Sequence, residues 1–190
     1  MRENIFKNVP FLLHGTFICC DGRPSVCVGD TMRGRGEQYV EDWASLGPIY
    51  ERLEELRPED CIAHKDAVFM SPDRHDMAIS GGPSEECILV VQPVGDVHRH
   101  DISWLIRARE ISNDEDMDEN ERQVDIDDCI HSYWSGEAYE GIYEYLAKEV
   151  VVKEELYPNT DEERLSFLER SVTIAECEPQ EYNSQGPSPF

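Results

Sequence analysis

A histidine inside an apolar stretch near the N-terminus is the first residue that could do chemistry. His14 follows Leu12-Leu13 and precedes Gly15-Thr16. A histidine in an apolar strand must find a hydrogen-bond partner or face a cleft, and a neighbouring glycine lets another molecule approach the backbone closely. The pattern suits a ligand-binding strand, and it equally suits a core histidine that bonds a backbone carbonyl.

A glycine-rich loop with two arginines follows. In the segment Gly29–Gly36, Arg33 and Arg35 are flanked by glycines. Flexible backbone and guanidinium groups together suit a pyrophosphate clamp, because arginine pairs well with phosphate oxygens. The segment has no Gly-Lys-Ser/Thr and is not a Walker A loop. A solvated turn is the alternative interpretation.

Two later segments add polar groups to apolar strands. In Val68–Asp73 a short strand runs into a helix start, with Ser71 as N-cap and Pro72 at the first helical position. Such a helix start could face an anion or be an ordinary turn. In Tyr143–Leu146 two aromatic residues flank Glu144. A carboxylate held in this way suits hydrogen bonding to a ribose hydroxyl and stabilisation of a developing cation, although an outward-facing glutamate on an edge strand gives the same pattern.

The elements that must position these residues are short and irregular. Strands are expected at 11–20, 25–28, 67–70 and 87–93, with a last strand pair, or a helix end and a strand, at 143–156. Helices are expected at 41–56, 71–80, 100–109 and 161–170. The regular alternation of a doubly wound fold is absent, so we expect an α+β fold with a mainly antiparallel sheet and short peripheral helices.

The segment Asn113–Asp128 is strongly acidic, since nine of its sixteen residues are Asp or Glu. It offers too little apolar surface to offset its ordering entropy. We therefore expect an exposed, mobile loop that folding does not need.

Composition bounds the function classes. The 190 residues fit one domain, here 1–157, followed by a short helix and a disordered acidic tail at 158–190. The net charge of −24 repels nucleic-acid phosphate and anionic membranes. The seven cysteines form no CxxC pair, which argues against a zinc site. Without a signal peptide or a membrane span, we expect a soluble, cytoplasmic protein.

Taken in order, the four segments resemble the ADP-ribosyltransferase superfamily, and in particular its His-Tyr-Glu branch, which includes diphtheria toxin and poly-ADP-ribose polymerases. The His-Gly-Thr segment, the Gly29-Asp30 loop and the Cys87–Pro93 strand are also similar to rifampin ADP-ribosyltransferases. The resemblance covers about Val9 to Leu156. It implies the split, mainly antiparallel sheets of that superfamily.

The resemblance implies that NAD is the substrate and that no metal is needed. His14 would bond the NAD ribose, Gly15 would hold the nicotinamide amide, and Glu144 would be the catalytic carboxylate. The residues expected around NAD are His14, Gly15, Thr16, Arg33, Arg35, Tyr39, Phe69, Ser71 and Tyr143.

One family feature is missing. The tyrosine that stacks on nicotinamide has no counterpart, and Ile79 falls near its place. Phe69, Tyr39 or Tyr143 would supply the aromatic face instead. The departure favours transfer of a single ADP-ribose over polymer synthesis.

The acceptor is not identified by the sequence, although the acidic charge favours a protein over nucleic acid. A toxin or a phage–host conflict factor would fit this activity. Two other functions stay open. The charge also suits a non-enzymatic inhibitor or nucleic-acid mimic that binds a basic partner, with Asn113–Asp128 as its contact. A metal-dependent hydrolase would use His98, His100 and Asp101, although a polar turn after Gly95-Asp96 is the simpler interpretation.

Overall fold

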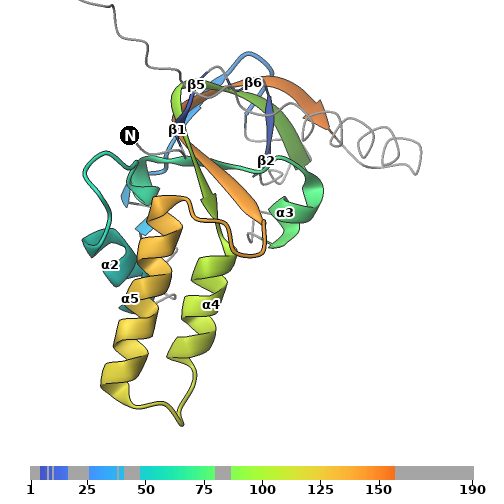
Figure 1. Ribbon diagram of the computed structural model, residues 1–190. Coiled ribbons are helices and arrows are strands. Elements are labelled where there is room, and N and C mark those ends of the chain that lie inside the picture. Colours follow the sequence, from blue (N-terminus) through green and yellow to red (C-terminus); the bar gives the residue numbers. More distant parts are fainter. Residues whose placement is uncertain are drawn as a thin grey trace, which may run out of the picture.

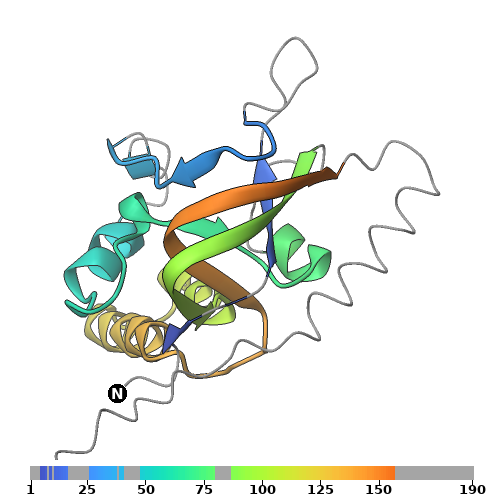
Figure 2. The same cartoon turned by 90° about the horizontal axis from the view of Figure 1, so that it is seen from above.

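A computed structural model describes residues 5–7, 9, 11–16, 26–37, 39–40, 48–79 and 87–156. Its centre is a pair of long antiparallel strands, β5 (Cys87–Asp101) and β6 (Tyr143–Leu156) (Figures 1 and 2). Short strands flank the pair. They are β1 (Ile5–Phe6) and β2 (Leu12–Thr16) on β5, and β3 (Thr31–Arg33) and β4 (Val68–Met70) on β6.

The five strand pairings among the described residues are all antiparallel. The expectation of an α+β fold with an antiparallel sheet is therefore confirmed at this level. The six strands form one sheet, and its two edges curl toward each other. Leu13 of β2 and Ser71, just after β4, exchange two backbone hydrogen bonds of 2.9 and 2.8 Å.

The curled sheet encloses one apolar core and packs a second against helices. Residues of β5 and β6 alternate between the two faces, so that Tyr145 joins the enclosed core while its neighbour Glu144 points to the opposite face. On that opposite face lies a cluster centred on Tyr133 and Trp134. The position of Glu144 in a polar–aromatic layer is thus set by the strand period.

The described residues include four α-helices. They are α2 (Pro48–Glu55), α3 (Arg74–Ile79), α4 (Ser103–Ser112) and α5 (Glu119–Ser135). In the chain, α4 and α5 connect β5 to β6. The two helices form a hairpin that extends away from the sheet (Figure 1). None of the helices that the structure describes is long and apolar enough to cross a membrane.

The expectation of a loop over 113–128 is wrong for most of the segment. Residues 113–118 form the turn between α4 and α5, but residues 119–128 belong to α5, where the Asp118 side chain caps the helix by accepting from the backbone N–H groups of Asn120 and Glu121. Ile126 is buried in the cluster centred on Tyr133 and Trp134. A capped helix needs only one apolar stripe, and an acidic outer face is compatible with it.

Three other expected elements differ. Residues 26–30 form a turn and not a strand, because the Asp30 side chain binds the Cys27 amide; the strand follows at Thr31. Ser71 caps no helix; Asp73 binds the Asp76 amide at the start of α3 instead. β5 continues through residues 98–101, which were expected to form a turn and the start of a helix.

The other expectations hold where they can be compared. The strands at 12–16, 68–70 and 87–93 are confirmed, and 143–156 is one continuous strand. α2 begins at Pro48, so the expected helix at 41–56 is confirmed in its second half only. The expected strand at 17–20, the first half of that helix, the helix at 161–170 and the C-terminal tail lie outside the described residues.

The packing of α5 generates a direct test. Replacing Ile126 by Ala removes a buried side chain and should lower the free energy of unfolding by ~2–4 kcal/mol. Val124 is 59% exposed two residues earlier, so Val124→Ala should change it by less than ~0.5 kcal/mol. Urea unfolding measures both values. Equal, small losses would show that the acidic segment does not pack as described.

Candidate functional site

Glu144 is a buried carboxyl group that makes one short hydrogen bond to the residues that the structure describes. Its side chain is 3% exposed, and the Tyr133 hydroxyl donates to Oε1 over 2.7 Å. Burial raises the pKa of Glu144 to about 7, because the charged form loses its hydration; the Tyr133 hydrogen bond acts in the opposite direction. A carboxyl group that titrates near neutrality is typical of functional sites.

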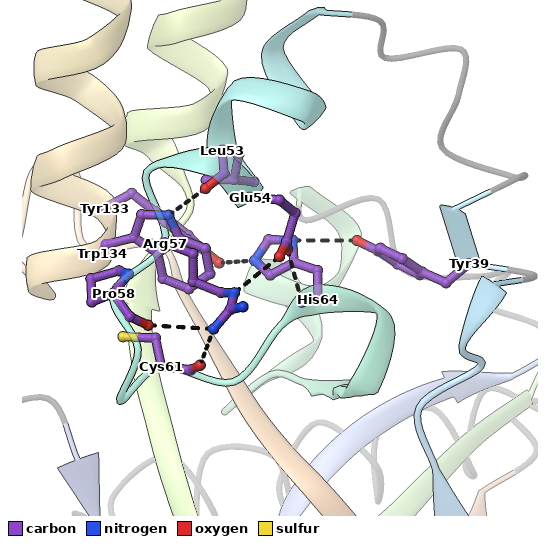
Figure 3. Close-up of polar contacts among 9 residues, drawn as sticks. All are labelled: Tyr39, Leu53, Glu54, Arg57, Pro58, Cys61, His64, Tyr133 and Trp134. Carbon is purple, nitrogen blue, oxygen red and sulfur yellow. Dashed lines mark hydrogen bonds and ion pairs between the residues drawn. The ribbon is translucent and has the colours of Figure 1, made fainter.

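A chain of polar contacts continues from Tyr133. Its hydroxyl oxygen lies 2.8 Å from Nε2 of His64, and Nδ1 of His64 lies 3.4 Å from the Tyr39 hydroxyl (Figure 3). All four side chains are buried. Burial lowers the pKa of His64 to about 3, so its ring is neutral at physiological pH.

Local packing holds His64 in this chain. The carboxylate of Glu54 accepts from the His64 backbone N–H over 3.0 Å and pairs with Arg57. Arg57 also donates to the Cys61 carbonyl over 2.8 Å (Figure 3). The segment after α2 is therefore tied at both ends, and the imidazole of His64 points between Tyr39 and Tyr133.

A close backbone contact brings Tyr39 to His64. A Cβ added at Gly34 would lie 2.3 Å from the Asp66 carbonyl carbon, so only glycine fits there. The Gly36 amide then bonds the Lys65 carbonyl over 2.8 Å. The glycine-rich loop therefore packs against the 3-10 helix His64–Asp66. This packing is separate from the phosphate binding that the sequence predicts for the loop.

The aromatic candidates separate into two places. The Tyr39 ring stacks on Phe69 with centroids 5.3 Å apart, and His64 meets the edge of the same cluster. Tyr143 lies instead under the Arg99 guanidinium, 4.8 Å from its ring centroid, against the enclosed core. Tyr39 and Phe69 therefore belong with the Glu144 chain, and Tyr143 does not.

His14 approaches this cluster from β2. Its Nδ1 lies 2.7 Å from the Phe69 carbonyl, which makes Nδ1 the donor and leaves Nε2 as the acceptor nitrogen. Burial lowers the pKa of His14, and the charge of Arg35 lowers it further. Arg35 also lies over the Tyr39 ring, 5.6 Å from its centroid.

The remaining candidates lie apart from this cluster or serve the backbone. Arg33 pairs with Glu149 at the exposed end of β3, over 2.6 Å. Gly15 pairs with Ile88 within the sheet, Thr16 ends β2 opposite Cys87, and Ser71 bonds the backbone of Leu13. The expectation that His14 and Glu144 face a single pocket stays a prediction.

The metal-hydrolase residues have structural partners. Oδ2 of Asp101 accepts from the amides of Tyr139 and Gly141, over 2.7 and 2.8 Å, and its other oxygen binds Ser103. His100 contacts the Tyr133 carbonyl through Nδ1 over 2.9 Å. Within the described ranges, no group of three or more His, Cys, Asp or Glu residues is placed to hold a metal ion.

A groove of about 290 Å³ lies elsewhere, where β5 bends. It is lined by Lys7, Val9, Gln92, Pro93, Gly95 and Asp96. It contains none of the predicted site residues and no convergent catalytic groups.

His64 and Tyr133 were not among the site residues predicted from the sequence. They connect Tyr39 to Glu144 through hydrogen bonds. The spacing of Ile126, Ile130 and Tyr133 is that of one helix face, and this signal would have placed Tyr133 inside. His64 stands alone in an irregular segment, and its partners are distant in sequence. No local pattern identifies it.

Comparisons of the chain with protein-family models, with curated proteins and with solved structures found no match. The function must therefore be argued from the geometry of the site.

The ionisation of Glu144 should make stability depend on pH. The carboxyl loses its proton near pH 4.5 in the unfolded chain and near pH 7 in the folded protein. Between these values the unfolded state binds fewer protons, so stability falls as pH rises and levels off above about 7. The contribution is on the order of 3 kcal/mol.

Glu144→Gln keeps the acceptor oxygen for Tyr133 and removes this titration. Its free energy of unfolding, relative to that of the wild type, should rise by on the order of 3 kcal/mol between pH 4.5 and pH 8 in urea titrations. A constant difference across this range would show that Glu144 is not buried as described.

Proposed function

We propose that the protein is an NAD-dependent ADP-ribosyltransferase in which Glu144 is the catalytic carboxylate. The observation that carries the proposal is the buried Glu144 carboxyl, held by Tyr133 on a face of β6 that also carries the Tyr39–Phe69 aromatic pair. A fixed negative charge in a water-poor site stabilises a developing cation strongly. The motif order and the antiparallel sheet support the same proposal.

In this mechanism NAD loses nicotinamide and an acceptor nucleophile attacks C1′ of the ribose. The bond between C1′ and the nicotinamide nitrogen breaks, and its electron pair leaves with nicotinamide. Glu144 would orient the ribose through its 2′-hydroxyl and stabilise the positive charge that remains. Nε2 of His14, fixed as an acceptor by the Phe69 carbonyl, would bond the other ribose hydroxyl.

Tyr39 and Phe69 would supply the aromatic surface for nicotinamide. The centroids of these two rings lie 5.3 Å apart. Arg35 lies over the Tyr39 ring and would be the arginine nearest to the pyrophosphate. Arg33 has a carboxylate partner on the surface and contributes less. The acceptor is proposed to be a macromolecule, with protein favoured because the chain carries a charge of −24.

The acidic hairpin supports a second candidate, a non-enzymatic protein that binds a basic partner. Exposed acidic residues lie in the turn between α4 and α5 and on the outer face of α5. They are Asp114, Glu115, Asp116, Asp118, Glu119, Glu121 and Asp128. Such a surface steers a cationic protein toward it. Neutralising these residues to Asn and Gln would abolish partner binding under this candidate and leave nicotinamide release unchanged under the transferase proposal.

The transferase proposal is tested by nicotinamide release from labelled NAD in the presence of cell lysate. Glu144→Gln should lower turnover by ~10²-fold or more, while NAD affinity changes far less, because the lost charge matters most in the transition state.

Glu149→Gln is the matched control, since Glu149 lies on the same strand but pairs with Arg33 at the surface. It should keep nearly full activity. The proposal fails if Glu144→Gln retains wild-type turnover. Loss of activity in Glu140→Gln alone would assign the role to that exposed neighbour.

A further inference from the structure

The buried contacts around Glu144 have a defined direction. An ionised carboxylate only accepts, so the Tyr133 hydroxyl must donate its single proton to Glu144. The Tyr133 oxygen can then only accept from His64, which places the imidazole proton on Nε2. Nδ1 of the neutral ring is left as the acceptor for the Tyr39 hydroxyl.

We propose that Tyr133 and His64 are positioning residues for Glu144, forming a one-way hydrogen-bond relay that favours the ionised form of the buried carboxylate and fixes its orientation. Its effect on turnover rests on the proposed function of Glu144, whereas its effect on ionisation rests on the contacts alone. Neither residue touches the reacting atoms.

Each member of the relay acts through the next. Burial favours the neutral form of Glu144, and the Tyr133 hydroxyl is the group that opposes it. A hydroxyl that itself accepts an N–H bond is polarised and becomes a better donor, by ~10–30% in strength. His64 therefore strengthens the Tyr133 bond, and the Tyr39 hydroxyl helps to hold the tautomer in which His64 can do so.

The surroundings of the relay fix its geometry. The His100 ring stacks on Tyr133 with centroids 4.6 Å apart, and Trp134 donates from Nε1 to the Leu53 carbonyl over 2.9 Å. Among the described residues, the titratable and charged groups facing the relay are Arg35, Tyr50, Glu54, Arg57, Cys61 and His100. Burial lowers the pKa of His64, and the charges of His100 and Arg57 lower it further, so the imidazole stays neutral while Glu144 titrates.

The direct test measures the ionisation of Glu144 without any substrate. The carbon-13 signal of its carboxyl is followed by NMR across pH in protein labelled at glutamate, and Glu144→Gln identifies the signal. The wild-type midpoint is expected at about 7. Tyr133→Phe removes the bond that favours the charged form, so the midpoint should rise by ~1 unit or more.

Two His64 variants separate the relay from general packing. His64→Phe keeps a ring but removes the N–H, and it should raise the midpoint by less than Tyr133→Phe does. His64→Gln offers a side-chain N–H to the Tyr133 oxygen. Its midpoint should therefore lie between those of His64→Phe and the wild type. If Tyr133→Phe does not fold, this pair still decides the question.

Tyr50→Phe is the matched control, because Tyr50 lies in the same cluster and its ring is 6.4 Å from that of His64. The structure assigns its hydroxyl no place in the relay, so the midpoint should not move. An unchanged or lowered midpoint in Tyr133→Phe, or equal shifts in Tyr50→Phe and His64→Phe, would overturn the proposal.

The pH profile of nicotinamide release then separates the two proposals. Turnover should rise with pH through the Glu144 midpoint, and this limb should move upward in Tyr133→Phe by the same amount as the NMR midpoint. An NMR shift with no matching change in the profile would confirm the relay and contradict the role of Glu144 in transfer.

Discussion

The cost of burying the Glu144 carboxyl is the constraint around which the described structure is arranged. An ion removed from water loses several kcal/mol of solvation unless polar groups replace the water. Here the replacement is one hydroxyl, from Tyr133 at the C-terminal end of α5, at 2.7 Å. The α4–α5 hairpin connects β5 to β6, and the last turns of α5, where the chain returns to the sheet, bring this hydroxyl to Glu144. The acidic face of α5 is the solvated side of this helix.

The residues of the proposed site come from segments far apart in the chain. His14 lies on β2, Tyr39 follows the glycine-rich loop, Phe69 lies on β4 and Glu144 on β6. The contact of Gly34 with the Asp66 backbone and the contact between Leu13 and Ser71 bring these segments together. The buried Glu144 carboxyl lowers the stability of the fold once it ionises, and groups that cost stability in this way are common at functional sites.

Much of the sheet could be predicted from the sequence, because β-branched and apolar runs such as Cys87–Pro93 and the run around Val150 indicate buried strands directly. The start of α5 was not predicted because the acidic composition of the segment was given more weight than the spacing of its apolar residues. Ile126, Ile130 and Tyr133 recur at the helical period and form one apolar stripe. The contact between His64 and Tyr133 could not be predicted, since it spans 69 positions and depends on how the segment after α2 packs against α5.

The central claim is that the face of β6 carrying Glu144 binds the nicotinamide riboside of NAD. A crystal structure of the Glu144→Gln protein with NAD tests it most directly, because slow turnover would keep the substrate intact. The account predicts the C1′ atom beside the side chain at position 144, a ribose hydroxyl on Nε2 of His14, and the nicotinamide ring against Tyr39 or Phe69. NAD bound at a different face, with His14 and position 144 both untouched, would contradict it.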